Sequence, residues 1–146
     1  MTTISKDFTF AASHRLQHLP EGHPCQRLHG HNYVIRVTLE GPVDPATGFV
    51  LDYRALAPFG AWLDEHLDHQ HLNDALPELF PGPTSERMAE HLLDVLTREV
   101  DLPLGVHTVT VGVSETPKTW AHSTATRDYA GAAAVDADRY RWGVCP

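Results

Sequence analysis

The stretch His31–Gly41, HNYVIRVTLEG, alternates apolar and polar side chains along its length. Tyr33, Ile35, Val37 and Leu39 share one parity, and Arg36, Thr38 and Glu40 share the other. In an extended chain, alternate side chains point to opposite faces, so the first four form an apolar face and the other three lie on the opposite one. The pattern therefore predicts a strand with one face on a core.

Three other stretches extend this pattern in both directions along the chain. Ile4–His14 predicts a strand upstream, Val106–Glu115 predicts a strand downstream, and Lys118–Ser123 predicts a short last strand. Residues 17–27, QHLPEGHPCQR, contain proline and glycine with little periodicity and predict a loop.

Two segments between the second and third strands have helical periodicity. The first, Asp52–Leu67, contains Pro58, which removes a backbone donor. Either its first turn is irregular, or the regular helix begins near Ala57 with Pro58 at its first position. The second helix begins after Thr84 as N-cap and ends before Pro103. The order β-β-α-α-β-β predicts an α+β fold, a four-stranded antiparallel sheet with two helices on one face.

Length and composition limit the class of protein. The chain has 146 residues, with 42% hydrophobic and 21% charged residues, which is typical of one folded domain. Its formal net charge of −8 argues against nonspecific binding to nucleic acid or to an anionic membrane. No apolar run approaches the roughly 20 residues of a membrane span, and no secretory leader is recognised. We therefore expect a soluble, cytoplasmic protein.

Histidine is unusually frequent, with 11 copies, and its placement suggests a metal site. His29 and His31 lie two apart in an extended segment, so both side chains can approach one ion. His14 ends the preceding strand, and antiparallel pairing could bring it beside them. Three imidazoles leave a fourth position of zinc open, as in catalytic sites. The alternative is that the H-x-H pair is surface decoration in a loop.

Cys25 lies four residues before His29. Near a zinc ion its thiolate would be favoured, which makes it a candidate general base. It could equally be a fourth ligand that closes the site. The spacing does not separate these two interpretations.

Two acidic residues are further candidates. Asp68 precedes His69 at the end of the first predicted helix, where the two could form an oriented acid–base pair or be surface decoration. The neighbouring His66 and His71 are expected to be exposed. Glu115 has the parity of the core-facing valines, so its carboxylate either faces a bound ligand or reaches water at the strand end.

Six ordered motifs resemble those of the 6-pyruvoyl-tetrahydropterin synthase family, and within it the bacterial 6-carboxy-tetrahydropterin synthases of 7-deazaguanine (queuosine) biosynthesis. The motifs are F-x-A-x-H-R-L (Phe10–Leu16), C-x-x-x-H-G-H-N-Y (Cys25–Tyr33), G-x-V-x-D-Y (Gly48–Tyr53), L-D-H-x-x-L-N (Leu67–Asn73), P-T-S-E (Pro83–Glu86) and S-E-T-P (Ser114–Pro117). The stretch Lys6–His31 is especially similar to the bacterial branch.

The resemblance implies a role for each candidate residue. The zinc ligands would be His14, His29 and His31. Cys25 matches the cysteine that abstracts a proton, and Asp68 with His69 matches the second acid–base pair. Glu115 matches the glutamate that anchors the pterin ring and belongs to the charge relay. Arg15 and Arg27 are the nearest basic candidates for the triphosphate, which otherwise has no assigned contact.

The resemblance also implies a reaction and an assembly. The expected reaction converts 7,8-dihydroneopterin triphosphate to 6-carboxy-5,6,7,8-tetrahydropterin, acetaldehyde and triphosphate with Zn²⁺ as cofactor. The alternatives are triphosphate elimination alone, giving 6-pyruvoyl-tetrahydropterin, and a paralogue that binds a pterin or purine without turnover. The expected fold is the tunnelling fold, whose sheets join into a β-barrel, and the expected assembly is a homo-hexamer, a dimer of trimers.

The resemblance divides the chain in two. Residues 1–123 are predicted to form the tunnelling-fold domain, and residues 124–146 form a C-terminal extension that matches nothing in the family. Cys145 lies in this extension and is expected to have no function.

Overall fold

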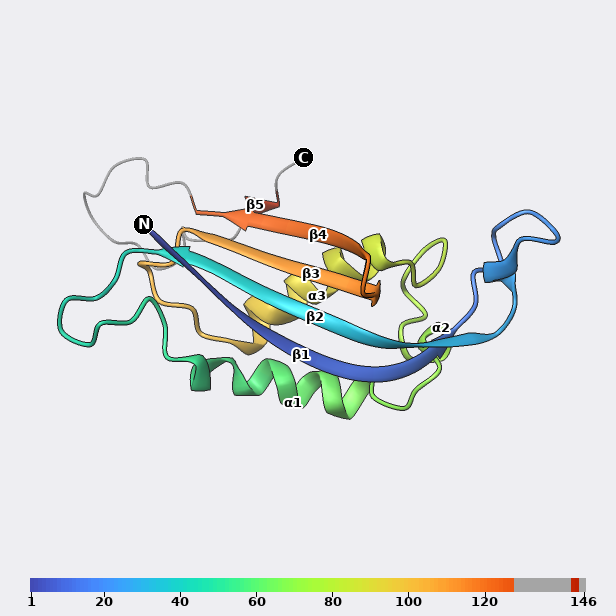
Figure 1. Cartoon of the computed structure of the whole chain (residues 1–146), viewed down its shortest axis with the longest axis horizontal. Coiled ribbons are helices and arrows are strands. Elements are labelled where there is room, and N and C mark those ends of the chain that lie inside the picture. The colour runs from blue at the N-terminus through green and yellow to red at the C-terminus, as the bar shows by residue number, and fades with distance from the viewer. Residues whose placement is uncertain (128–142, 145–146) are drawn as a thin grey trace.

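Two long strands, β1 (Thr2–His14) and β2 (His29–Gly41), pair antiparallel along their whole length (Figure 1). The computed structural model describes residues 1–127 and 143–144 of the chain. Both strands were predicted from alternation, and each begins two residues earlier than expected. Their register places the last residue of β1 opposite the first residue of β2, so the two histidines at these positions face each other.

The sheet continues with β3 (Thr108–Thr116) and β4 (Thr119–Thr126), again antiparallel. The four predicted strands and their antiparallel arrangement are therefore confirmed. A two-residue strand, β5 (Gly143–Val144), is added beside the end of β4. The sequence analysis did not include it, because two residues cannot carry a periodic pattern.

The predicted extension over residues 124–146 is described only in part. Its first three residues belong to β4, which runs beyond the predicted end at Ser123. Residues 128–142 and 145–146, with the runs AGAAAV and DRYRW and with Cys145, lie outside the described part of the chain.

Helix α1 (Ala57–His66) follows a short 3-10 turn over Tyr53–Leu56. Pro58 lies in the first turn of α1, where its missing N–H has no intrahelical partner to lose. The sequence left two alternatives for this proline, and the structure combines them. The chain before the helix is irregular, and the regular helix begins at Ala57.

Helix α3 (Ser85–Glu99) begins as predicted, because the Thr84 hydroxyl accepts a hydrogen bond from the Arg87 N–H at 3.3 Å. A single helical turn, α2 (Leu72–Ala75), lies between the two longer helices. No helix in the described ranges is long and apolar enough to cross a membrane.

The core lies between the sheet and helices α1 and α3, which cover one face (Figure 1). The four apolar residues of β2 are at most 1% exposed, and burial of each stabilises the fold by about 1.5–3 kcal/mol. The residues on the opposite face of β2 are all half-buried or exposed. Both ends of the β1–β2 pair are thereby held in register, including the end that carries the histidines.

Candidate metal centre and active site

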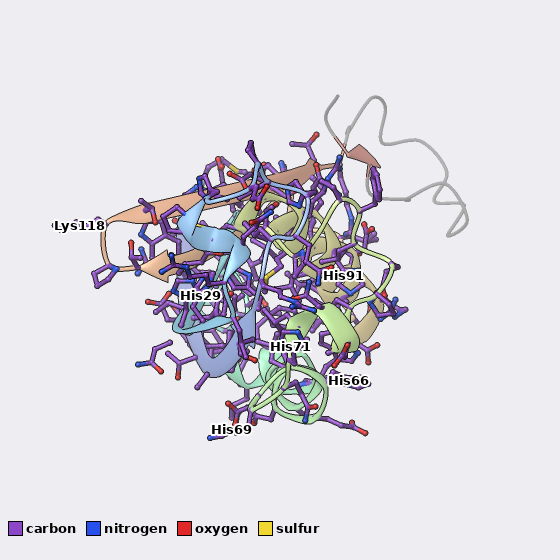
Figure 2. All side chains as sticks on the ribbon, turned by 90° about the vertical axis from the view of Figure 1, so that its right-hand side faces the viewer. His29, His66, His69, His71, His91 and Lys118 are labelled. Carbon is purple, nitrogen blue, oxygen red and sulfur yellow. The ribbon has the colours of Figure 1, made fainter. Side chains whose placement is uncertain are left out.

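His14, His29 and His31 meet on one face of the sheet at the end of the β1–β2 pair. His14 is directly opposite His29, and His31 is opposite Ala12, so the strand pairing alone places all three side chains together. One ring nitrogen of each lies within 4.8 Å of the other two. Figure 2 faces this end of the molecule and labels His29 there. The structure thus brings together the three histidines that the sequence indicated.

Hydrogen bonds to the backbone determine how two of these rings are oriented. His14 Nδ1 donates to the Pro83 carbonyl at 2.9 Å, and His29 Nδ1 donates to the Arg27 carbonyl at 2.6 Å. Because a carbonyl can only accept, both Nδ1 atoms carry the hydrogen, and in neutral rings both Nε2 atoms carry a lone pair. These two Nε2 atoms are 3.0 Å apart. Two lone pairs that face each other repel, so a cation between them would stabilise this arrangement.

A metal ion suits this position better than a proton. Burial of the His14 side chain, which is 1% exposed, lowers the pKa of the ring, and burial also lowers the pKa of His31. His31 Nε2 is buried and has no hydrogen-bond partner among the described residues. Nitrogen ligands on a tetrahedral zinc are separated by about 3.3 Å, close to the observed spacing of His14 and His29. The three residues therefore fit a metal ion.

Glu115, at the end of β3, lies beside this cluster. Its Oε1 atom is 3.8 Å from His14 Nε2, and its side chain is 24% exposed. It therefore lies beside the histidines, and part of it remains open to solvent. A cavity of about 230 Å³ adjoins it, lined also by Thr84, Ser85, Glu86 and Trp120. A hydrogen-bonding ligand could occupy this cavity within reach of the histidine cluster.

Cys25 is held in the loop between β1 and β2. It is half-buried in a 3-10 turn over Pro24–Gln26, and its carbonyl accepts from the Leu16 N–H at 2.8 Å. Among the described residues, the group able to hold a metal contains the three histidines and leaves Cys25 out. This arrangement keeps the cysteine separate from the ligand set.

Asp68 and His69 follow α1 and contact the outer edge of β1. Asp68 Oδ2 is 2.9 Å from His69 Nδ1, and Asp68 Oδ1 accepts from the Ala11 N–H at 3.0 Å. The Ala11 and His69 hydrogen bonds together lower the pKa of Asp68, so the carboxylate is favoured. The His69 side chain is 81% exposed. The structure therefore forms the predicted pair and presents its imidazole to solvent.

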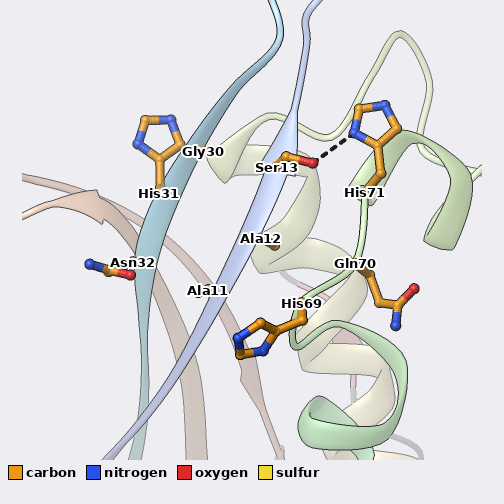
Figure 3. Close-up of a pocket in the computed structure, with 9 residues that line it drawn as sticks. All are labelled: Ala11, Ala12, Ser13, Gly30, His31, Asn32, His69, Gln70 and His71. Atoms are coloured by element: carbon orange, nitrogen blue, oxygen red, sulfur yellow. Dashed lines mark hydrogen bonds between the residues drawn. The ribbon is translucent and has the colours of Figure 1, made fainter.

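His71 differs from the expectation that it would be exposed. It is half-buried, because its Nδ1 lies 3.0 Å from Ser13 Oγ and its backbone forms a parallel bridge with β1. His66 is exposed, as expected. Ser13 was not among the candidate residues predicted from the sequence. Its position two residues after Ala11, on the same face of an edge strand, was a possible signal. Ser13 and His71 both line an open cleft of about 590 Å³ (Figure 3).

Comparison with known proteins gives a consistent result across sequence and structure. A family model described as 6-pyruvoyl tetrahydropterin synthase matches residues 3–126. A 6-carboxy-5,6,7,8-tetrahydropterin synthase of Synechocystis sp. is 39% identical over 116 residues, which cover 76% of this chain and 85% of that protein. A 6-pyruvoyl tetrahydrobiopterin synthase of Homo sapiens is 34% identical over 118 residues, covering 70% of this chain and 78% of the relative.

Solved structures have the same fold. The 6-pyruvoyl tetrahydropterin synthase of Caenorhabditis elegans superposes with a TM-score of 0.70 at 30% identity, covering 83% of this chain and 93% of that one. A 6-pyruvoyltetrahydropterin synthase of Plasmodium vivax gives the same TM-score at 21% identity, covering 86% and 98%, and supports the fold alone. The α+β tunnelling fold expected from the sequence is therefore confirmed.

Proposed function

Because the chain belongs to the 6-pyruvoyl tetrahydropterin synthase family, we propose that it is a zinc-dependent lyase of the 6-carboxy type. The substrates are 7,8-dihydroneopterin triphosphate and one water, and the products are 6-carboxy-5,6,7,8-tetrahydropterin, acetaldehyde and triphosphate, in the 7-deazaguanine pathway. The observation that supports it most is the pair of Nε2 lone pairs 3.0 Å apart, in a cluster of one buried and two half-buried histidines beside a carboxylate.

The zinc ligands in this proposal are His14, His29 and His31. Bound zinc would polarise the side-chain oxygens of the substrate. The protein prepares the site by orienting its ligands, since the Pro83 and Arg27 carbonyls hold the Nδ1–H groups of His14 and His29. This orientation is present without any rearrangement of the backbone.

Glu115 is assigned to the pterin ring. A carboxylate can accept two N–H donors from the amino-pyrimidinone edge, and such paired bonds distinguish a pterin from a ring that lacks them. Trp120 lines one wall of the adjoining cavity of about 230 Å³. The ring would then lie within a few ångströms of His14.

Cys25 and the Asp68–His69 pair are assigned to proton transfer. The reaction removes a proton from carbon and adds one to the ring, which calls for a base and an acid on different sides of the substrate. The Asp68 carboxylate holds the Nδ1–H of His69, so His69 Nε2 is free to accept or donate a proton. Cys25 supplies the other group.

The working assembly is proposed to be a hexamer of two stacked trimers. Apart from the part contacted by residues 69–71, the outer edge of β1 has no strand beside it in the described sheet. Open edges are usually paired or covered, and pairing between subunits would close a barrel. The exposed His69 then meets a second subunit, and one site would combine its imidazole with the other subunit's cysteine.

The decisive experiment is incubation of the purified, zinc-loaded protein with 7,8-dihydroneopterin triphosphate, followed by mass spectrometry. Acetaldehyde and 6-carboxy-tetrahydropterin are expected. The human relative is named for 6-pyruvoyl chemistry, so 6-pyruvoyl-tetrahydropterin without acetaldehyde is the second candidate. Tight binding of the pterin with no product would instead indicate a binding protein.

A further inference from the structure

The segment 69–71 lies alongside the edge of β1 and is joined to it by main-chain hydrogen bonds. His69 N–H donates to the Ala11 carbonyl at 2.7 Å, and Ser13 N–H donates to the Gln70 carbonyl at 3.1 Å. His71 and Ser13 complete a parallel bridge. Figure 3 shows this segment crossing beside the strand. The segment that contains His69 of the acid–base pair therefore covers the last part of the β1 edge.

One side-chain hydrogen bond reinforces this contact. Ser13 Oγ and His71 Nδ1 are 3.0 Å apart, and both residues are half-buried (Figure 3). His71 is also the N-cap of α2, whose first residue, Leu72, is fully buried. The His71 backbone is thus fixed to the core, and its side chain connects that fixed point to β1.

The residue between these anchors has an unfavourable backbone. His69 has a φ of 57°, a left-handed conformation that costs a non-glycine residue on the order of 1 kcal/mol. Its imidazole is 81% exposed, so packing around the ring does not hold it. The conformation is held by the main-chain hydrogen bonds to β1 and by two side-chain contacts, that of Asp68 with Ala11 upstream and that of His71 with Ser13 downstream.

We infer that Ser13 and His71 are positioning residues, whose hydrogen bond holds the His69 backbone in its left-handed conformation and so directs its imidazole. This inference rests on the proposed role of His69 in proton transfer. When the bond is lost, the segment 69–71 can relax toward a negative φ, and the ring turns away from the substrate. A misplaced proton donor slows the chemical step and leaves ground-state binding unchanged.

Kinetics of four variants test the inference. His71→Leu and Ser13→Ala should each lower kcat by about 10–100-fold, with KM within about twofold and zinc content unchanged. The double variant should be no slower than the slower single variant, since both changes remove one shared bond. His71→Asn places an amide nitrogen where Nδ1 was, and should recover most of kcat. His66→Leu, an exposed histidine on α1, is the matched control and should leave kcat unchanged.

Hydrogen exchange separates this inference from the proposed activity. In His71→Leu, the His69 and Ser13 amides should exchange faster than in the parent protein, whether or not the parent turns over a pterin. Unchanged exchange would overturn the inference, as would multiplicative losses in the double variant or an effect confined to KM. If these amides exchange faster in His71→Leu but the parent shows no turnover, the proposed function fails and the positioning contact stands.

Discussion

The histidine cluster and the Asp68–His69 pair are both attached to the last four residues of β1, yet the fold holds them differently. His14 is 1% exposed and is aligned by strand register, with core side chains behind it. His69 is 81% exposed and is held by hydrogen bonds from one loop to one strand edge. A rigid site suits metal ligands, which must converge on one ion. An exposed pair can instead act on a molecule that approaches from solvent.

The largest expected effect comes from breaking the buried member of this comparison. His29→Ala should lose bound zinc and reduce activity to background, because two remaining imidazoles do not hold the ion. The measurement is metal content by plasma mass spectrometry together with turnover. His66→Ala is the matched control, because His66 is an exposed histidine on α1, and this variant should retain full metal. Stoichiometric zinc in His29→Ala would mean that another group supplies the ligand.

Removing the cysteine should separate metal binding from chemistry. Cys25→Ala is expected to keep one zinc per chain and its pterin affinity while losing about 10²–10⁴-fold in kcat, since a general base acts mainly in the transition state. A turnover assay measures kcat, and a fluorescence titration measures the pterin affinity. Near-normal turnover would move the base elsewhere, and His69 would be the next candidate.

The exposed pair gives a test of assembly. If one site takes Cys25 from one subunit and His69 from another, then mixing the inactive Cys25→Ala and His69→Ala proteins after dissociation should restore activity. Random exchange leaves about a quarter of the junctions with both groups intact. Sizing and native mass spectrometry must first show subunit exchange. A mixture that stays inactive despite exchange would contradict shared sites.

The smallest expected effect concerns pH and the Asp68 anchor. The hydrogen bond from Ala11 and the contact with His69 lower the pKa of Asp68 in the folded protein. The carboxylate therefore stabilises the fold above its unfolded pKa of about 3.9, and this contribution is lost as the pH falls through the lower folded value. Asp68→Asn should lower Tm by about 2–4 °C at pH 7. The difference from the parent should shrink below about pH 4, and a constant difference would show that the charge is not involved.

Sequence alternation was sufficient for the parts of the fold that repeat. The parity of His29 and His31, and the position of His14 at a strand end, followed from period two, and the pairing of β1 with β2 then determined which side they share. Thr84 as N-cap and Pro58 in the first turn were likewise local signals.

Contacts that join distant, non-periodic segments could not be predicted in this way. Ser13 and His71 are 58 residues apart, and the loop that carries His71 has no alternation to reveal its docking on β1. The positive φ of His69 does not follow from its residue type alone, because hydrogen bonds on both sides hold it. The prediction that His71 would be exposed was wrong for this reason: its burial comes from the strand edge that it covers.

The connection over residues 15–28 joins β1 to β2, and strand pairing, rather than the length of this loop, determines where His14 meets His29. Insertions or deletions in the loop would leave the ligands in place while moving Cys25 along it. The histidine cluster and the proposed proton-abstracting cysteine are in this sense separate parts of one hairpin. In an evolving or engineered lineage, the three histidines can therefore stay constant while the length and sequence of the loop change. The loop could then carry its reactive group at another position, or carry a different residue type in that role.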